Sequence, residues 1–198
     1  MPRIRPYRPG DEPELASVCL RTAASGADAT GMLDDDELWA NLFVLPYVTH
    51  DPELAFVAEA DDGRVAGYIV ATADTGGFEE WFRSGWWPRF AGRWPEPVHG
   101  LSEQDRLLRY AYGRGSESIP YAAEYPAHLH IDLLPELQRQ GWGRRLTAAL
   151  TEALREAGVP GLHLIARAEN VGAVAFYERL GFLELGRDPS MVAFGMEL

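Results

Sequence analysis

The chain has 198 residues, 46% of them hydrophobic, and a net charge of −12. Length and apolar content indicate a globular protein and exclude a disordered chain, and the acidic balance argues against nucleic-acid binding, because neutralising phosphates takes clustered basic residues. The N-terminus has no apolar signal region and no apolar run reaches the length of a membrane span, so we expect a cytoplasmic protein that does not bind membranes.

All 18 basic residues are arginine, which excludes Schiff-base chemistry and a lysine general base. Cys19 is the single cysteine, so no internal disulfide can form, as expected in a reducing compartment. Because Cys19 lies among apolar residues of an expected helix, we interpret it as a packed thiol rather than a nucleophile. The five histidines have no ligand spacing beyond one His-x-His pair, so no metal site is expected.

The N-terminal part of the chain predicts a strand, two helices and a hairpin. The expected ranges are a strand at 4–9, helices at 11–24 and 35–45, and strands at 53–59 and 64–72. Asp11 followed by Glu14 has the spacing of a capping box that starts the first helix. Pro46 is expected to end the second helix, and Gly63 supplies the positive φ that a tight hairpin turn needs.

Residues 76–125 are the least regular part of the sequence and read as an insertion between the third and fourth strands. A helix is expected over 101–112, where apolar residues share one face. The rest is rich in tryptophan and phenylalanine, interrupted by glycine and proline. A connection of this length is often a functional lid. Its aromatic side chains could wall a substrate pocket, form a satellite core or make a dimer contact, and the sequence leaves all three open.

The C-terminal part alternates strands and helices in short succession. The expected ranges are strands at 128–134, 161–167, 182–186 and 191–197, and helices at 144–157 and 171–180. The first of these helices is amphipathic, with apolar residues at helical spacing. Gly158 and Gly181 follow the helices at positions where a left-handed residue closes a helix. We find no internal repeat and no second domain boundary, so residues 1–198 are expected to form one domain.

The strongest local signal is the turn between the strand at 128–134 and the helix at 144–157. In order, it contains Gln138, Arg139, Gln140, Gly141, Trp142, Gly143, Arg144 and Arg145. Two glycines let the backbone approach a ligand closely, and the first turn of the helix offers free amides and the positive end of its dipole. This arrangement favours phosphate binding. The alternative is a tight turn that binds nothing, because the sequence matches neither a Walker loop nor the full Rossmann pattern.

Two spaced motifs resemble those of the GNAT acetyltransferase family. The segment Gln138-x-x-Gly141-x-Gly143 is similar to the family's Q/R-x-x-G-x-G/A signature, whose amides wrap the pyrophosphate of coenzyme A, and the preceding Leu133-Leu134-Pro135-Glu136 resembles its V-x-P-E segment. A second match resembles the family's N-x-x-A-x-x-F-Y-x-x-x-G-F segment and consists of Asn170, Ala173, Phe176, Tyr177, Gly181 and Phe182.

The resemblance implies an α/β GNAT fold, with a central mixed and mostly antiparallel sheet of about seven strands flanked by helices. It implies acetyl transfer from acetyl-CoA, the cosubstrate, to a primary amine of a small molecule or peptide, by direct attack and without a metal. The cofactor-binding residues that it implies are Leu133, Leu134, Gln138, Arg139, Gln140, Gly141, Trp142, Gly143, Arg144, Arg145, Asn170, Ala173, Phe176 and Tyr177. Family members are often dimers, so a homodimer is one assembly that the resemblance allows.

Tyr177 matches the family tyrosine that protonates the departing sulfur. Its ordinary pKa of about 10 keeps it protonated at neutral pH; the alternative is a tyrosine packed on the helix face. Asn170 matches a residue that contacts the cofactor, although helix capping would also explain it. The backbone amide near Leu133 matches the donor that stabilises the oxyanion.

The general base is less well defined. His128, His130 and Asp132 alternate along the expected strand and therefore share one face. The two histidines resemble the His-x-His pair of serotonin N-acetyltransferase, one residue out of register, and a one-residue slip exchanges the faces of a strand. A solvated or hydrogen-bonded strand edge is the alternative interpretation. Glu79 and Glu80 of the insertion are reserve candidates.

Two rival functions stay open. Segments such as 86–90 are faintly similar to the acetyltransferase-like C-terminal domain of O-GlcNAcase, whose animal versions have lost the glycine turn. That likeness allows a catalytically inactive protein that binds coenzyme A or a protein partner, although this chain keeps Gly141 and Gly143. The second rival is a transferase of longer acyl groups. The sequence does not identify the acceptor.

Overall fold

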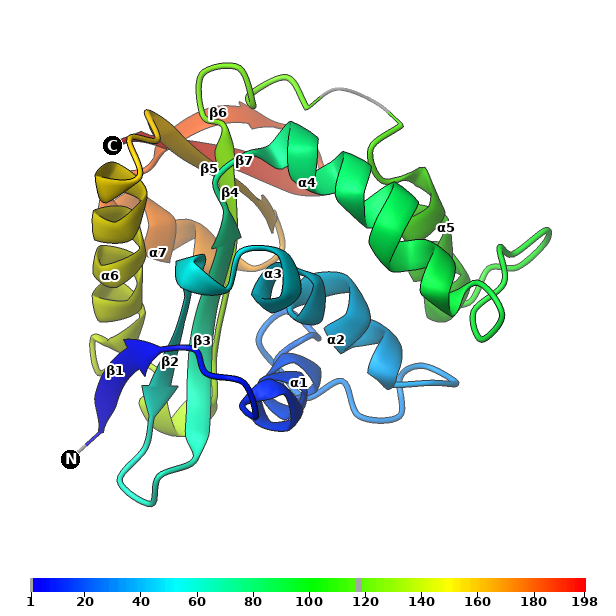
Figure 1. Ribbon diagram of the computed structural model, residues 1–198, viewed down its shortest axis with the longest axis horizontal. Coiled ribbons are helices and arrows are strands. Elements are labelled where there is room, and N and C mark those ends of the chain that lie inside the picture. Colours follow the sequence, from blue (N-terminus) through cyan, green and yellow to red (C-terminus); the bar gives the residue numbers. More distant parts are fainter. Residues whose placement is uncertain (1, 117–118) are drawn as a thin grey trace.

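A seven-stranded mixed sheet forms the centre of the computed structural model, which describes residues 2–116 and 119–198 (Figure 1). The strands are β1 (Arg3–Pro6), β2 (Ala55–Glu59), β3 (Val65–Thr72), β4 (Ala127–Leu133), β5 (Gly161–Arg167), β6 (Leu183–Arg187) and β7 (Met191–Glu197). Their order is β1-β2-β3-β4-β5-β7-β6. Among the described strands, β4 and β5 form the one parallel pair. The predicted α/β fold with a mostly antiparallel sheet is confirmed.

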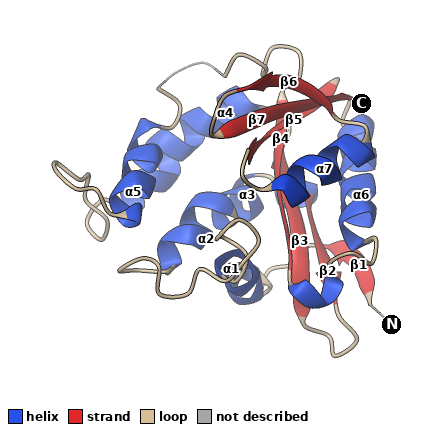
Figure 2. Cartoon of the chain, turned by 180° about the vertical axis from the view of Figure 1, so that it is seen from behind, coloured by secondary structure: helices blue, strands red, loops and turns tan. Residues whose placement is uncertain are grey.

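Helices cover both faces of the sheet (Figures 1 and 2). They are α1 (Glu12–Leu20), α2 (Glu37–Phe43), α3 (Leu45–His50), α4 (Thr75–Trp81), α5 (Glu103–Gly113), α6 (Trp142–Glu156) and α7 (Val171–Leu180). Helix α6 packs against β2, β3 and β4, whereas α1 and α3 pack against β3 from the opposite face. All eight residues of β3 are buried, which explains its almost continuous apolar sequence. No helix in the described part of the chain is long and apolar enough to span a membrane.

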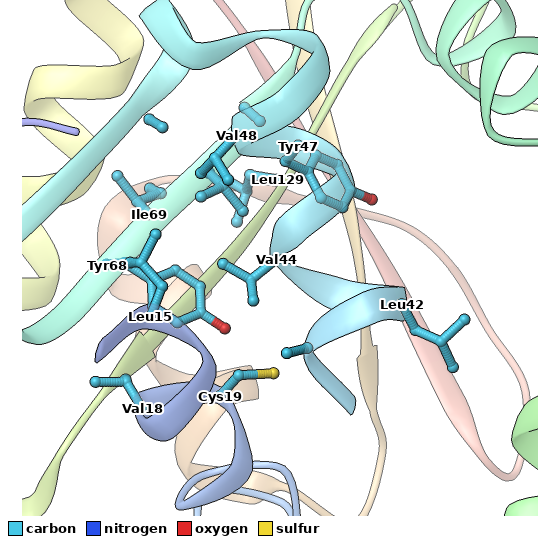
Figure 3. Packing of buried hydrophobic residues seen from close by; sticks show 14 of the residues in the cluster. Leu15, Val18, Cys19, Leu42, Val44, Tyr47, Val48, Tyr68, Ile69 and Leu129 are labelled. Carbon is cyan, nitrogen blue, oxygen red and sulfur yellow. The ribbon is translucent and has the colours of Figure 1, made fainter. Parts of the chain in front are cut away.

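The core between α1, α3 and the sheet is built from aliphatic side chains and two tyrosines (Figure 3). Cys19 is 2% exposed and lies in this cluster, and burial raises the pKa of its thiol, so the interpretation as a packed thiol is confirmed. Tyr47 and Tyr68 are also buried. Their hydroxyl groups need partners, and both find them on β4.

The start of the chain departs from the predicted capping. The side chain of Asp11 makes no cap hydrogen bond to α1; its carboxylate instead accepts from Arg5 at 2.7 Å and from the Arg8 amide at 2.8 Å. Glu14 accepts a hydrogen bond from the Val65 amide. An ion pair with β1 and a hydrogen bond from a β3 amide have therefore replaced the local capping pattern.

Two other helix boundaries were predicted wrongly. The expected helix at 35–45 is divided into α2 and α3, and Pro46 lies in the first turn of α3, where a fixed φ and a missing N–H are tolerated. Helix α6 begins at Trp142 with Gly141 as its N-cap, so Gly143 belongs to the helix and not to the turn before it. The hairpin at Gly63, with φ +87°, and the closing glycines Gly158 and Gly181 are confirmed.

Five of the eleven aromatic side chains of residues 76–125 are core residues. This segment lies between β3 and β4 and contains α4, α5 and, between them, a π turn (Phe82–Trp86) and a 3-10 turn (Trp87–Phe90). Five aromatics that are at most 4% exposed join the hydrophobic core: Phe78, Phe82, Trp86, Trp87 and Trp94. Of the three interpretations, the packed core fits these five residues.

Candidate active site

A cavity of about 820 Å³ lies where β4 and β5 separate. The two strands pair at Ala127 with Leu162 and at His128 with His163, and beyond these positions they diverge. The walls come from the α1–α2 loop, the second half of β4, the turn before α6 and the face of α7. The topology thus opens a wedge in the sheet at the carboxyl end of β4, next to the predicted turn.

The cavity edge of β4 carries backbone groups without a strand partner. The amide of Leu134 donates to the carbonyl of Ala66 on the β3 side at 2.9 Å. Because successive residues of a strand direct their N–H groups to opposite sides, the amides of Leu133 and Ile131 face the cavity, which both residues line. This edge could pair with an extended ligand as an added strand would.

The turn before α6 is built to leave space at the helix N-terminus. Gly141 has φ +84°, and a Cβ there would meet nothing within 4 Å. Arg139 also has a positive φ, +59°, which is uncommon for a residue with a side chain and is often associated with functional sites. Because the first amides of the fifteen-residue helix α6 have no intrahelical partner, the turn is suited to an anion.

Three arginines surround this space in a chain of net charge −12. Arg139 and Arg144 come from the turn and α6, and Arg179 comes from α7; all three line the cavity. Within the described ranges none of them has an ion-pair partner. Unpaired guanidinium groups around a helix N-terminus favour a ligand with several negative charges, such as a phosphorylated one.

The predicted cofactor residues are distributed between the cavity and the core. Those that line the cavity are Leu133, Gln138, Arg139, Gly141, Gly143, Arg144, Asn170, Ala173, Phe176 and Tyr177. Leu134 and Trp142 are buried in the core, Gln140 bonds the carbonyl of Glu136, and the guanidinium of Arg145 stacks on Trp142; these four do not line it. Asn170 caps α7, since its Oδ1 accepts from the Ala173 amide at 3.0 Å.

Gly143 has a packing role in addition to its place in the cavity wall. A Cβ at this position would lie 2.9 Å from Cζ of Phe176 and 3.5 Å from Cδ1 of Leu133. The glycine therefore lets the first turn of α6 approach α7 and β4 closely. Of the two motif glycines, Gly141 is the one whose backbone needs a left-handed conformation.

Tyr177 and Asp132 both line the cavity. Tyr177 is buried against Phe182 and Phe194, and burial together with the charge of Asp132 raises the pKa of its hydroxyl. Burial also raises the pKa of Asp132, opposed by its hydrogen bond from Tyr68 at 2.5 Å. The arrangement keeps Tyr177 protonated well above neutral pH, so it can act as a proton donor.

His128 and His130 lie beside Asp132 along β4, on the face that α1 and α3 cover. Oη of Tyr47 lies 2.7 Å from Nε2 of His128 and 3.1 Å from Nε2 of His130, and Tyr68, the partner of Asp132, packs in the same layer (Figure 3). The expectation that the three β4 side chains share a face is confirmed. Neither histidine lines the cavity between β4 and β5.

Both imidazoles are held neutral. Burial lowers the pKa of His128 well below its usual range, and burial with the nearby Arg114 guanidinium lowers the pKa of His130 to about 3. Arg114 forms a buried ion pair with Glu79 at 2.6 Å, and Glu80 pairs with Arg83 at the surface. The two reserve candidates are therefore both engaged by arginines.

Sequence reasoning missed several residues that shape the site. Thr22, Ser25 and Gly26 of the α1–α2 loop form a cavity wall, and Ser25 reaches Glu169 near the start of α7 at 3.3 Å. No local pattern marks this loop as part of a site. Ile131 could have been found, because it alternates with Leu133 along the same strand edge.

In the described part of the chain, no group of three or more His, Cys, Asp or Glu side chains could hold a metal ion.

The crystal structure of SsHAT is similar to this chain, with a TM-score of 0.94 and 40% identity over 99% of this chain and 98% of that chain. A structure of PH1933 from Pyrococcus horikoshii OT3, 17% identical over 100% of this chain and 99% of that chain, has a TM-score of 0.64 and shows the same fold.

Two curated relatives match different shares of the chain. Protein O-GlcNAcase of Rattus norvegicus is 23% identical over 93% of this chain and 20% of its own length, so the chain spans about a fifth of that relative. The [ribosomal protein bS18]-alanine N-acetyltransferase of Escherichia coli strain K12 is 32% identical over 46% of this chain and 65% of its own length. The model of the acetyltransferase (GNAT) family matches residues 20–182, most of the sequence, and the chain therefore belongs to that family.

Proposed function

We propose that this protein transfers the acetyl group of acetyl-CoA to a primary amine by direct attack, without an acetyl-enzyme. The observation that carries the proposal is one cavity lined by Tyr177, by the free edge of β4 and by arginines that have no ion-pair partner among the described residues. Membership of the GNAT family supports the reaction class, and the acetyltransferases among the relatives favour catalysis over an inactive fold.

Different residues of the cavity would bind different parts of acetyl-CoA. Arg139, Arg144 and the N-terminus of α6 would hold the phosphates, because charge and free amides are concentrated there. The amides of Leu133 and Ile131 would pair with the amide-rich arm. When bound, acetyl-CoA supplies a thioester carbon that an amine can attack.

One β4 amide near Leu133 would serve the carbonyl oxygen instead of the arm and stabilise the negative charge that develops there, since it is fixed in the strand before the reaction starts. Tyr177 would donate a proton to the departing sulfur. Its raised pKa suits this role, because the group stays protonated over the whole physiological range. In this assignment Asp132 acts on Tyr177 through its charge.

His130 is the base that the hydrogen bonds favour. The Asp132 carboxylate is engaged by Tyr68, and both ring nitrogens of His128 have partners. His130 is half-buried and uses Nε2 for Tyr47; its Nδ1 has no hydrogen-bond partner among the residues that the structure describes. A neutral imidazole with one free nitrogen can accept the proton that the acceptor ammonium must lose.

The acceptor is a primary amine on a small molecule or a peptide. The net charge of −12 would steer cationic amines toward the protein, and the bacterial relative named for acetylating an alanine of a ribosomal protein supports including peptide N-termini among the acceptors to be tested.

The test has two parts. Isothermal titration of acetyl-CoA should give micromolar binding, and thiol release with a panel of polyamines, amino acids and peptides should identify an acceptor. Binding without turnover of any amine would support the inactive alternative. Propionyl-CoA and butyryl-CoA, titrated and assayed in parallel, separate acetyl transfer from transfer of longer acyl groups; tighter binding and faster turnover of those analogues would overturn the acetyl assignment.

A further inference from the structure

Four side chains form a continuous hydrogen-bonded row that leads away from His130. His130 Nε2 lies 3.1 Å from Oη of Tyr47, which lies 2.7 Å from Nε2 of His128. On the other side of that ring, Nδ1 lies 2.8 Å from Oγ1 of Thr75. The row joins two residues of β4 through one residue of α3 and one of α4, and its middle members are less than 10% exposed.

The protons of this row have one consistent direction. The Thr75 hydroxyl donates to the Pro126 carbonyl at 2.7 Å, so it must accept from His128, whose Nδ1 therefore carries the proton. Nε2 of His128 is then an acceptor, and Tyr47 donates to it. Because the single Tyr47 proton is used there, its oxygen accepts from His130 Nε2–H. This leaves Nδ1 of His130 unprotonated, as a base requires.

The far end of the row is Thr75, which is 1% exposed and lies in the wall of a second cavity. This cavity has a volume of about 530 Å³ and is also lined by the exposed residues Asp74, Glu80 and Ser116. The Pro126 carbonyl also accepts the backbone amide of Thr75 at 2.8 Å, so it keeps a partner when the Thr75 hydroxyl turns away from it. Water in this cavity can therefore take a proton from Thr75.

We propose that Tyr47, His128 and Thr75 relay to the second cavity the proton that His130 takes from the acceptor ammonium. The inference rests on the proposed acetyl transfer and adds the route by which its proton leaves. Tyr47, His128 and Thr75 act through His130 and are positioning residues; none of them needs to contact the substrate.

Each transfer in the relay breaks one bond to hydrogen and forms another. The ammonium N–H proton goes to Nδ1 of His130 while the Nε2 proton goes to Oη of Tyr47. The Tyr47 proton passes to Nε2 of His128, the Nδ1 proton of His128 passes to Thr75, and the Thr75 proton passes to water. The net change is one proton moved from the ammonium to water, and every side chain ends neutral.

Tyr47 is held in the geometry that the relay needs. Its ring is 1% exposed and stacks on Phe78 with centroids 4.4 Å apart, and its hydroxyl points away from the aliphatic side chains around it (Figure 3). Arg114, paired with Glu79, reaches the same oxygen at 3.5 Å. The fixed positive charge of Arg114 makes a protonated imidazole unfavourable at this point. An extra proton is therefore not expected to remain on either histidine of the row.

The test removes one hydroxyl at a time without changing the packing. Tyr47→Phe and Thr75→Val are compared with Tyr112→Phe and Thr151→Val, which remove hydroxyls bonded to the carbonyls of Trp94 and Ala148. The relay variants should lower kcat by about 10- to 100-fold, a share of what acid–base catalysis contributes, with acetyl-CoA affinity unchanged. Added imidazole should restore much of the lost rate, because it accepts the proton from His130 directly. The control variants should stay within twofold of the wild type and show no imidazole dependence.

Three outcomes separate this inference from the proposed function. A wild-type protein that acetylates no amine contradicts the proposed function. Turnover by Tyr47→Phe within twofold of the wild type, or a loss that imidazole does not restore, overturns the relay alone. Nitrogen NMR of the histidines tests the row without turnover: His128 should be protonated at Nδ1 and His130 at Nε2 at pH 7, and the opposite tautomer at either ring refutes the proposed direction.

Discussion

Gly141→Glu tests the placement of the phosphates at the start of α6. The structure leaves open space where the Cβ would point, so the substitution causes no clash in the free protein. A glutamate would, however, bring a negative charge beside the space that Arg139 and Arg144 surround. Two unit charges about 4 Å apart repel by about 4 kcal/mol at an effective dielectric constant of 20. With about 1.4 kcal/mol per tenfold change, acetyl-CoA affinity should fall about 700-fold.

Gly158→Glu is the matched control at the other end of the same helix. Gly158 also has a positive φ, +72°, and open space at its Cβ, and it gives the same change in net charge. A side chain in this left-handed conformation costs about 1–2 kcal/mol, which lowers the melting temperature of a chain of this size by about 2–8 °C. Both variants should lose this stability, and isothermal titration should find weaker binding in Gly141→Glu alone. Equal affinity in the two variants would refute the phosphate site.

Three further predictions concern the catalytic groups. Tyr177→Phe should lower kcat about 100-fold and leave the acetyl-CoA dissociation constant within twofold, as measured by thiol release and titration; an unchanged turnover rate would make Tyr177 a packing residue. Asp132→Asn should move the alkaline limb of the pH–rate profile to lower pH, because Tyr177 loses the charge that raises its pKa. It should also raise the melting temperature at pH 7, since the desolvated carboxylate is removed, and this gain should vanish as the pH falls below the ordinary carboxyl value of 3.8. If Asp132→Asn instead slows turnover at pH 7 by about 100-fold or more, the range that a general base contributes, Asp132 is the base. Finally, the unfolding free energy should fall as the pH drops from 6.5 toward 3, by up to about 1.4 kcal/mol per pH unit for His130. The reason is that the imidazole of the unfolded chain gains its proton first, while the pKa of the folded one is about 3. Urea unfolding of His130→Asn should show a flatter dependence of the unfolding free energy on pH.

The succession of strands and helices along the chain and the turn before α6 could be predicted from the sequence alone. Alternation of apolar residues and the positions of glycines are local signals, so the strand at 161–167 and the helix at 171–180 were predicted with the bounds that the structure has. Asn170 and Gly181 cap that helix as their sequence positions indicate. The special backbone of Gly141 was likewise predictable, since glycine takes conformations that are closed to other residues.

The role of a residue could not be predicted where its partner lies far away in the chain. Gly143 was interpreted as a ligand contact, but the close approach of Phe176 gives it a packing role that depends on how α7 docks. The capping pattern of Asp11 and Glu14 was lost to partners on β1 and β3. The α1–α2 loop carries no motif and became a cavity wall through its position alone.

The environment of His130 depends on residues that only the folded chain brings together. Tyr47 and His128 are separated by 81 residues, and His128 and Thr75 by 53, so no periodicity in the sequence relates them. The sequence placed two histidines and an aspartate on one face of β4. Hydrogen bonds form when α3, α4 and the end of α5 pack against that face. They decide which histidine keeps a free nitrogen and where a proton can go, and the same packing keeps both imidazoles neutral.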